Sequence, residues 1–327
     1  MRGFRILSLD GGGIAGVLTL VLLERIVAEF PSFLSKVHLY AGTSTGGIIA
    51  LGLAKGLSPR ELRSLYENKG SVIFRDSTVD NAFDLGSMIG ANYDSTGLEG
   101  ELVRIFGTTT LGQLEKSVYI PAFDLDNQAA DPQRRAWEAK FFTNVGGIYG
   151  DADALCAKVA MYTSAAPTYF PAYEGYIDGG VVANNHSVAA LAHAIDTRKN
   201  RDAPKLDEIA LCSFGAGRSL RYIEGDALDW GYAQWARPLV NILINGVMGV
   251  ADYQCKQFLR ERYWRVNPTF PAGVDIQLDS VDAVGYLIET AEAVDLSETL
   301  LWIDRGWEVS QAAVVRSSRR CAPWRRF

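Results

Sequence analysis

A serine lies at the centre of a short, glycine-flanked motif. Residues 42–46 read GTSTG and match the G-x-S-x-G pattern, in which a nucleophilic serine occupies a sharp turn between a strand and a helix. Gly42 and Gly46 suit such a turn because it leaves no room for side chains two residues before and after Ser44. The start of the following helix also offers free N–H groups to an oxyanion. Ser44 is therefore a candidate nucleophile, although the same pattern also suits an ordinary turn of small residues.

A second glycine-rich turn precedes this motif. Residues 10–16 read DGGGIAG and follow an apolar segment, so their backbone N–H groups are expected to point at one anion. The glycines formally satisfy the G-x-G-x-x-G dinucleotide pattern, and one interpretation is a module that binds a nucleotide or phosphate. The next predicted strand, however, lacks the acidic residue that would hold a ribose. The other interpretation is that Gly11, Gly12 and Gly13 form an oxyanion hole for the serine.

A serine nucleophile needs a base, and one candidate is an aspartate. Asp178 ends a short apolar segment and is followed by Gly179 and Gly180, so we expect it at a sheet edge beside flexible backbone. A carboxylate must be partly desolvated to work as a base, because its ordinary pKa is near ~4. The same three residues also suit a simple Asp-Gly turn, and their spacing does not decide between the two roles.

The other candidates are the three histidines, which would make the chain a histidine-dependent serine esterase. His38 begins the predicted strand that leads to Ser44, so we expect it toward the far end of the sheet. His186 and His193 are two helical turns apart, which suits one face of a helix. A histidine base is therefore the weaker alternative.

Apolar strand-like segments alternate with helical patterns around these motifs. Strands are predicted at residues 4–10, 37–43, 118–125, 176–178 and 209–214. Helices are predicted before Pro31, at 45–55, from 58 onward, near 153–162, at 186–196 and near 284–291. Segment 84–112 is rich in Gly, Ser and Thr and is expected to be a loop-bearing insertion. The alternation predicts an α/β fold, a three-layer sandwich with a mostly parallel central sheet covered by helices on both faces.

The composition indicates one globular domain. The chain has 327 residues, of which 48% are hydrophobic and 21% charged, and it shows neither a linker-like stretch nor a fixed-period repeat. Within residues 1–327 we distinguish a motif-bearing core at 4–215, a helical extension at 216–315 and a basic tail at 316–327. No secretory signal, no membrane-spanning run and no paired or metal-type cysteine spacing is apparent. A cytoplasmic protein, with no nucleic-acid partner, is expected.

Two C-terminal features bear on a membrane partner. Residues 275–304 carry eight acids and no Lys or Arg, whereas the tail carries five arginines. We expect the tail to be disordered or docked on the acidic segment, with contact to anionic lipid headgroups as the alternative. Residues 242–250 form an apolar run, for which a core helix is favoured over a lipid-facing or acyl-binding one.

Four segments together resemble the patatin-like phospholipase family. They are DGGGIAG at 10–16, GTSTG at 42–46, TSAAPTYF at 163–170 and DGG at 178–180, and the resemblance covers residues 4–215. Their order and intervals fit the family, and the combination is far more specific than any one motif.

The resemblance implies a lipid acyl hydrolase with a Ser-Asp dyad. Ser44 and Asp178 would form the dyad, and Gly11, Gly12 and Gly13 the oxyanion hole. Esters of phospholipids or related acyl lipids would be cleaved through an acyl-enzyme, without a metal or organic cofactor and with peripheral contact to a membrane. Some bacterial relatives respond to a cyclic nucleotide, so a regulatory cyclic nucleotide is a further expectation. Many relatives carry Arg or Lys where this chain has Ala15, so any help from that side chain is absent.

Overall fold

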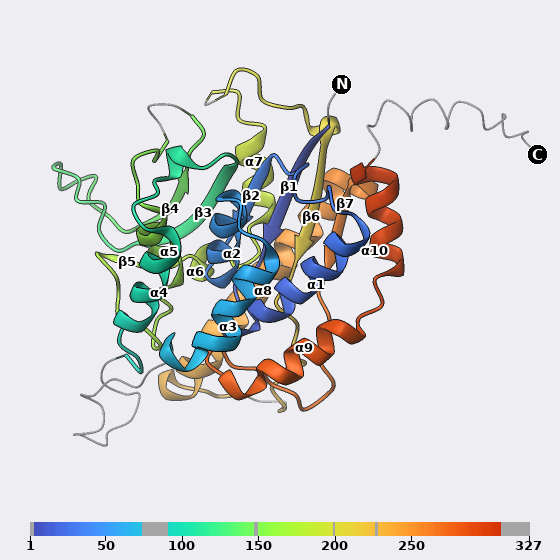
Figure 1. Cartoon of the computed structure of the whole chain (residues 1–327). Coiled ribbons are helices and arrows are strands. Elements are labelled where there is room, and N and C mark those ends of the chain that lie inside the picture. The colour runs from blue at the N-terminus through green and yellow to red at the C-terminus, as the bar shows by residue number, and fades with distance from the viewer. Residues whose placement is uncertain (1–2, 74–90, 147–149, 199, 226–227, 309–327) are drawn as a thin grey trace, which may run out of the picture.

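The structure is a computed structural model that describes residues 3–73, 91–146, 150–198, 200–225 and 228–308 (Figure 1). In these ranges the centre is a seven-stranded sheet in the order β4-β3-β2-β1-β6-β7, with β5 paired to β3. Strands β3, β2, β1, β6 and β7 are parallel to their neighbours, whereas β4 and β5 are antiparallel to β3. The strand bounds are Phe4–Leu9 (β1), Leu39–Gly42 (β2), Ser117–Asp124 (β3), Glu138–Thr143 (β4), Tyr176–Asp178 (β5), Ile209–Phe214 (β6) and Tyr263–Val266 (β7).

Helices cover both faces of the sheet, so the predicted three-layer α/β sandwich is confirmed. Neighbouring residues of β1 face opposite sides, because side chains alternate along a strand: Leu7 joins the larger apolar core and Ile6 the smaller one. The larger core is covered by Gly16–Glu29 (α1), Thr45–Ala54 (α2), Pro59–Ile73 (α3), Thr96–Phe106 (α4), Cys156–Ser164 (α5) and Val284–Ala293 (α9). The smaller core is covered by Ser187–Ala194 (α7) and the end of Tyr232–Leu259 (α8). Two further α-helices in the described ranges are short, Gly180–Ala183 (α6) and Ser297–Trp302 (α10).

Three elements differ from the sequence-based expectations. The part of segment 84–112 that the structure describes contains α4, a regular helix with Leu98 and Leu102 buried against the core, so the prediction of a loop-bearing insertion was wrong there. Residues 84–90 lie outside the described ranges, as does the basic tail at 316–327. Strands β4 and β7 were not predicted, because neither is a continuous apolar run or a strict alternation of apolar and polar residues.

The apolar run at 242–250 is the largest correction. It lies in α8, where Leu243 is 58% and Val250 56% exposed, so the preferred assignment to the core was wrong. Ala251, Cys255 and Leu259 further along the helix are buried on the sheet. The first part of α8 therefore extends past the sheet, and none of the other described helices or strands covers its outer side (Figure 1). Within the described ranges no helix, α8 included, has the combined length and apolar character that crossing a bilayer requires.

Candidate active site

Ser44 occupies the turn between β2 and α2, at the carboxyl end of the parallel strands. Its backbone has φ 53° and ψ −125°, a conformation that costs a non-glycine residue about 1–3 kcal/mol. A side chain on Gly42 would overlap the Gly46 carbonyl, and one on Gly46 would overlap the Leu9 carbonyl of β1. Both flanking glycines are therefore required by close backbone approach, as the motif predicts.

Asp178 lies at the end of β5, beside the serine turn. In the sheet Asp178 lies opposite Ala122 of β3, and its backbone N–H donates to the Ala165 carbonyl at 2.9 Å. Burial raises the pKa of its carboxyl from 3.8 to about 6, against the opposing effects of hydrogen bonds from the Gly180 N–H, at 2.6 Å, and from the Ser44 hydroxyl. The structure thus brings together the two residues that the motifs single out. A carboxylate with this pKa is a better proton acceptor near neutral pH than an ordinary aspartate.

Thr163, at the end of α5, fixes the position of both turns. Its hydroxyl accepts a hydrogen bond from the Ser44 N–H at 3.0 Å, and its carbonyl accepts one from the Gly179 N–H at 3.3 Å. Thr163 is the first residue of the TSAAPTYF segment, and the sequence pattern alone does not indicate its role. Because the Ser44 N–H is already bonded, it is not free to stabilise an oxyanion in this arrangement.

The glycine loop follows β1 and lies against Ser44. A side chain on Gly11 would contact the Ser44 Cβ at 3.1 Å, so the two turns touch. The Gly11 N–H donates to the Asn184 carbonyl at 3.4 Å, whereas the N–H groups of Gly12 and Gly13 have no hydrogen-bond partner among the described residues. Gly13 has φ 56°, and a side chain on it would overlap the Leu278 carbonyl. The loop therefore presents two unpaired donors, from Gly12 and Gly13, on the serine side of the sheet.

Ala15 forms the end of the one-turn helix that follows the loop. It is 4% exposed, and its N–H donates to the Gly12 carbonyl at 3.1 Å. The methyl group offers no charge, so recognition of an anionic group here depends on the backbone.

A buried ion pair connects the start of the glycine loop to strand β7. Asp10, which precedes the glycines, pairs with Arg265 of β7 at 2.5 Å between Oδ2 and Nη2, and the two side chains are 0% and 10% exposed. Arg265 also donates to the Ser213 hydroxyl of β6 at 2.7 Å. The Asp10 N–H donates to the Phe214 carbonyl at 2.9 Å. The C-terminal third of the chain thus anchors the first motif.

Replacing Arg265 by Met is expected to lower the free energy of unfolding by about 3–5 kcal/mol, because it leaves the Asp10 carboxylate buried without its cation. Urea denaturation of both proteins at neutral pH measures the difference. Arg221→Met is the matched control, because it removes a pair with Asp275 whose side chains are 35% and 46% exposed, and we expect it to cost at most about 1 kcal/mol. Equal losses in the two variants would contradict a structural role for the buried pair.

The three histidines have partners other than the serine hydroxyl. His186 is buried and its Nδ1 lies 2.8 Å from the Thr43 hydroxyl; burial lowers its pKa to about 4, so it is neutral. His193 stacks on Tyr119, with ring centroids 4.3 Å apart. His38 accepts a hydrogen bond from the Arg5 N–H at 3.1 Å, toward the amino end of β1. Asp178 is the titratable group that the structure places at Ser44.

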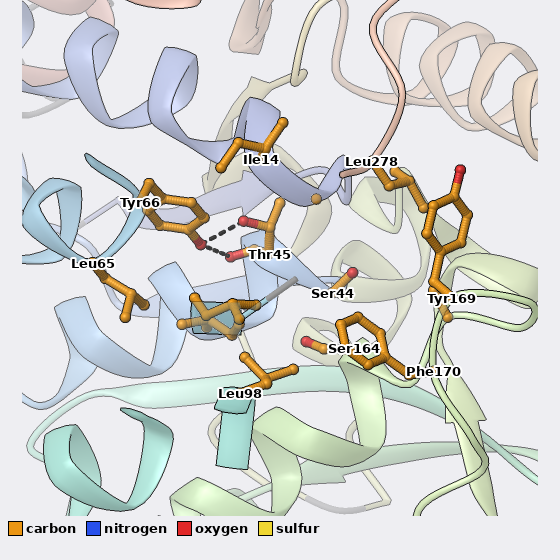
Figure 2. Close-up of a pocket in the computed structure, with 14 residues that line it drawn as sticks. Ile14, Ser44, Thr45, Leu65, Tyr66, Leu98, Ser164, Tyr169, Phe170 and Leu278 are labelled. Carbon is orange, nitrogen blue, oxygen red and sulfur yellow. Dashed lines mark hydrogen bonds between the residues drawn. The ribbon is translucent and has the colours of Figure 1, made fainter. Parts of the chain in front are cut away.

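An apolar pocket opens beside Ser44, with about 530 Å³ of space, part of it open to solvent. Figure 2 shows the Ser44 and Ser164 side chains in the middle of the view, with Leu65 on one side of them and Tyr169 on the other. The Thr45 hydroxyl at its wall bonds to the Tyr66 hydroxyl at 2.5 Å. The lining comes from six separate regions of the chain, which is why no sequence motif marks it: Gly13, Ile14, Ser44, Thr45, Ile48, Leu65, Tyr66, Ile73, Leu98, Ser164, Ala166, Tyr169, Phe170 and Leu278.

Comparisons with known proteins identify the family of the chain. The model of the family described as patatin-like phospholipase matches residues 7–192. Protein teg of Priestia megaterium is 27% identical, with 94% of this chain and 100% of that protein covered. A cGAMP-activated phospholipase of Pseudomonas aeruginosa is 29% identical, with 95% and 89% covered. The solved structure of VipD from Legionella pneumophila aligns with a TM-score of 0.43 and 12% identity, over 89% of this chain and 67% of that one. The family model spans more than half of the chain, which therefore belongs to the patatin-like phospholipase family.

Proposed function

We propose that this protein is a serine-dependent lipid acyl hydrolase that cleaves carboxylic esters of phospholipids or related acyl lipids. The observation that carries the proposal is that Ser44, in a strained turn in the lining of an apolar pocket, lies beside the buried Asp178, whose pKa its hydroxyl lowers. The pocket suits an acyl chain, because its wall is mostly hydrocarbon with a few hydroxyl groups among the aliphatic and aromatic side chains.

The proposed reaction proceeds in two halves. Asp178 accepts the proton of the Ser44 hydroxyl while the oxygen attacks the ester carbonyl, and the N–H groups of Gly12 and Gly13 stabilise the oxyanion. The carbon–oxygen bond to the lipid alcohol then breaks, and Asp178 returns its proton to that alcohol. In the second half, water attacks the acyl carbon while Asp178 takes its proton. The bond to the Ser44 oxygen then breaks, Asp178 returns the proton to that oxygen, and the fatty acid leaves. Gly11 contributes to the hole mainly by letting its backbone lie against Ser44.

Two alternatives use the same residues differently. In a nucleotide- or phosphate-binding module the glycine loop would hold the ligand, but the loop lies against a serine that has a buried carboxyl beside it, which favours acyl transfer. In a histidine-dependent esterase, His186 would be the base, but its low pKa and its bond to Thr43 favour a structural role. The buried free thiols Cys156, Cys212 and Cys255 suit the cytoplasmic location that we propose.

The acyl pocket provides the test. Wild-type protein is expected to hydrolyse esters of long-chain fatty acids, and Ile48→Trp, which fills the pocket, to lower that rate at least about tenfold while sparing short-chain esters. A panel of phospholipids, galactolipids and short esters measures this, with short-ester turnover as the internal control for folding. A parallel series with cGAMP is included because the Pseudomonas relative is named for activation by it. Absence of ester hydrolysis in every arm would overturn the proposal.

A further inference from the structure

The exposed face of α8 is a second apolar surface, separate from the pocket. Its side chains recur at three- and four-residue intervals on one side of the helix, and each is at least 37% exposed; together we call them the α8 face: Leu239, Ile242, Leu243, Val247, Val250 and Tyr253. The buried side of the helix carries Ala251, Cys255 and Leu259 instead. A contiguous exposed apolar surface of this kind is typical of an interaction site rather than of a free surface.

Helix α8, which carries this face, lies beside the glycine loop. On the inner side of the same helix, the Met248 sulfur lies 3.0 Å from the Asn184 amide nitrogen, which also donates to the Gly11 carbonyl at 3.3 Å. One side chain therefore separates α8 from the glycine loop. Residues before Met248 continue past the carboxyl ends of the strands, the edge at which Ser44 lies (Figure 1). The α8 face points away from this contact, so a surface that binds it is separated from the glycine loop by the width of the helix.

The low charge of this part of α8 and its tryptophans favour a lipid bilayer as the partner of the α8 face. Residues 230–251 contain no acid, and Arg237 is their one charged residue, although the chain as a whole carries a net charge of −6. At the start of the helix Trp230 and Trp235 contact each other edge to face at 5.1 Å, and tryptophan favours the interface of a bilayer. From Leu239 to Tyr253 the helix is about 21 Å long, too short to cross a bilayer but suited to lie in its surface.

We propose that the α8 face binds the surface of a phospholipid bilayer and thereby concentrates the protein at its lipid substrate. This inference rests on the proposed function, because a lipid substrate gives the site a reason to lie at a membrane. An uncharged apolar face binds by burial of hydrocarbon, so the association is insensitive to salt and does not require anionic lipid.

Flotation with phosphatidylcholine vesicles tests the proposal. The protein carries Ser44→Ala throughout, so that the vesicles stay intact. We expect it to float with the vesicles at low and high salt. Adding Leu243→Asp should weaken vesicle binding about tenfold, and adding Val250→Asp as well about a hundredfold. Leu301→Asp is the matched control: Leu301 is 46% exposed on α10, away from the site, and its replacement should leave flotation unchanged.

Activity separates this surface from the catalytic proposal. With Ser44 present, Leu243→Asp should hydrolyse a soluble short-chain ester at the wild-type rate but vesicle phospholipid at least about tenfold more slowly. Unchanged flotation of the double variant, or binding only to anionic vesicles at low salt, would overturn the α8 assignment. So would size-exclusion data in which Leu243→Asp dissociates a dimer that does not float. Loss of all ester hydrolysis with intact flotation would instead overturn the proposed function.

Discussion

Replacing Ser44 by Ala is expected to lower kcat for ester hydrolysis on the order of 10⁵–10⁶-fold, because no acyl-enzyme forms without the hydroxyl. Substrate binding should persist, since the pocket wall is untouched. A fluorophosphonate probe, which modifies activated serines, should label wild-type protein at Ser44 and leave the variant unlabelled. Mass spectrometry of the labelled peptide and a turnover assay provide the two measurements.

Ser164 supplies the matched control for this experiment. It lines the same pocket, and its hydroxyl is buried without a hydrogen-bond partner in the described structure. Ser164→Ala is expected to keep fluorophosphonate labelling and to change turnover less than tenfold, because no base lies beside that hydroxyl. If labelling followed Ser164 instead, or if the Ser44 variant still turned over, the nucleophile would be assigned wrongly.

Asp178→Asn is expected to lower kcat by about 10²–10⁴-fold, the usual contribution of a general base. In the wild-type protein kcat/KM should rise with pH through about 6, because burial raises the pKa of Asp178 to about 6 and only the ionised carboxylate accepts a proton. The variant should lose this limb of the profile. Asp151→Asn, which alters an ion pair with Lys140 outside the pocket, should keep it.

The raised pKa of Asp178 also predicts that Asp178→Asn, although less active, is more stable than the wild-type protein. The folded protein holds the Asp178 proton more tightly than the unfolded chain, whose pKa is near 3.8, so this group favours folding most below pH 3.8 and loses that contribution as the pH rises through 6. At pH 7 the buried ionised carboxylate therefore costs about 3 kcal/mol. Asparagine can still accept the Gly180 hydrogen bond, so Asp178→Asn should unfold at higher urea concentration than wild type. A variant that was both inactive and less stable would indicate a structural role instead.

Local geometry explains which parts of the site could be predicted from the sequence. Gly42 and Gly46 are required because the turn brings backbone segments into contact. Asp178 ends a strand and precedes two glycines. Both features are local, so the sequence around each residue is enough to predict them. The fold class was predictable for a similar reason, because buried parallel strands are continuous apolar runs between helical patterns.

The remaining parts of the site depend on contacts between distant residues. Thr163 bonds to Ser44 from 119 residues away, and Leu278 covers Gly13 from the C-terminal third. No periodicity or spacing encodes such pairs. The exposed α8 run was assigned wrongly because an apolar stripe shows that a helix buries one side, but not whether a layer of protein is present to cover it.

The ion pair between Asp10 and Arg265 has a consequence for synthesis of the protein. The two residues are 255 positions apart. Strand β7, which carries the arginine, and its neighbour β6 both follow the region that the family model matches. A growing chain that has emerged only through the serine and aspartate motifs holds the Asp10 carboxylate without its cation and β1 without one neighbouring strand. At about 5–20 residues per second, the ribosome needs several more seconds after Asp178 to supply them. We therefore expect a nascent chain to be inert toward lipid until its last third is made.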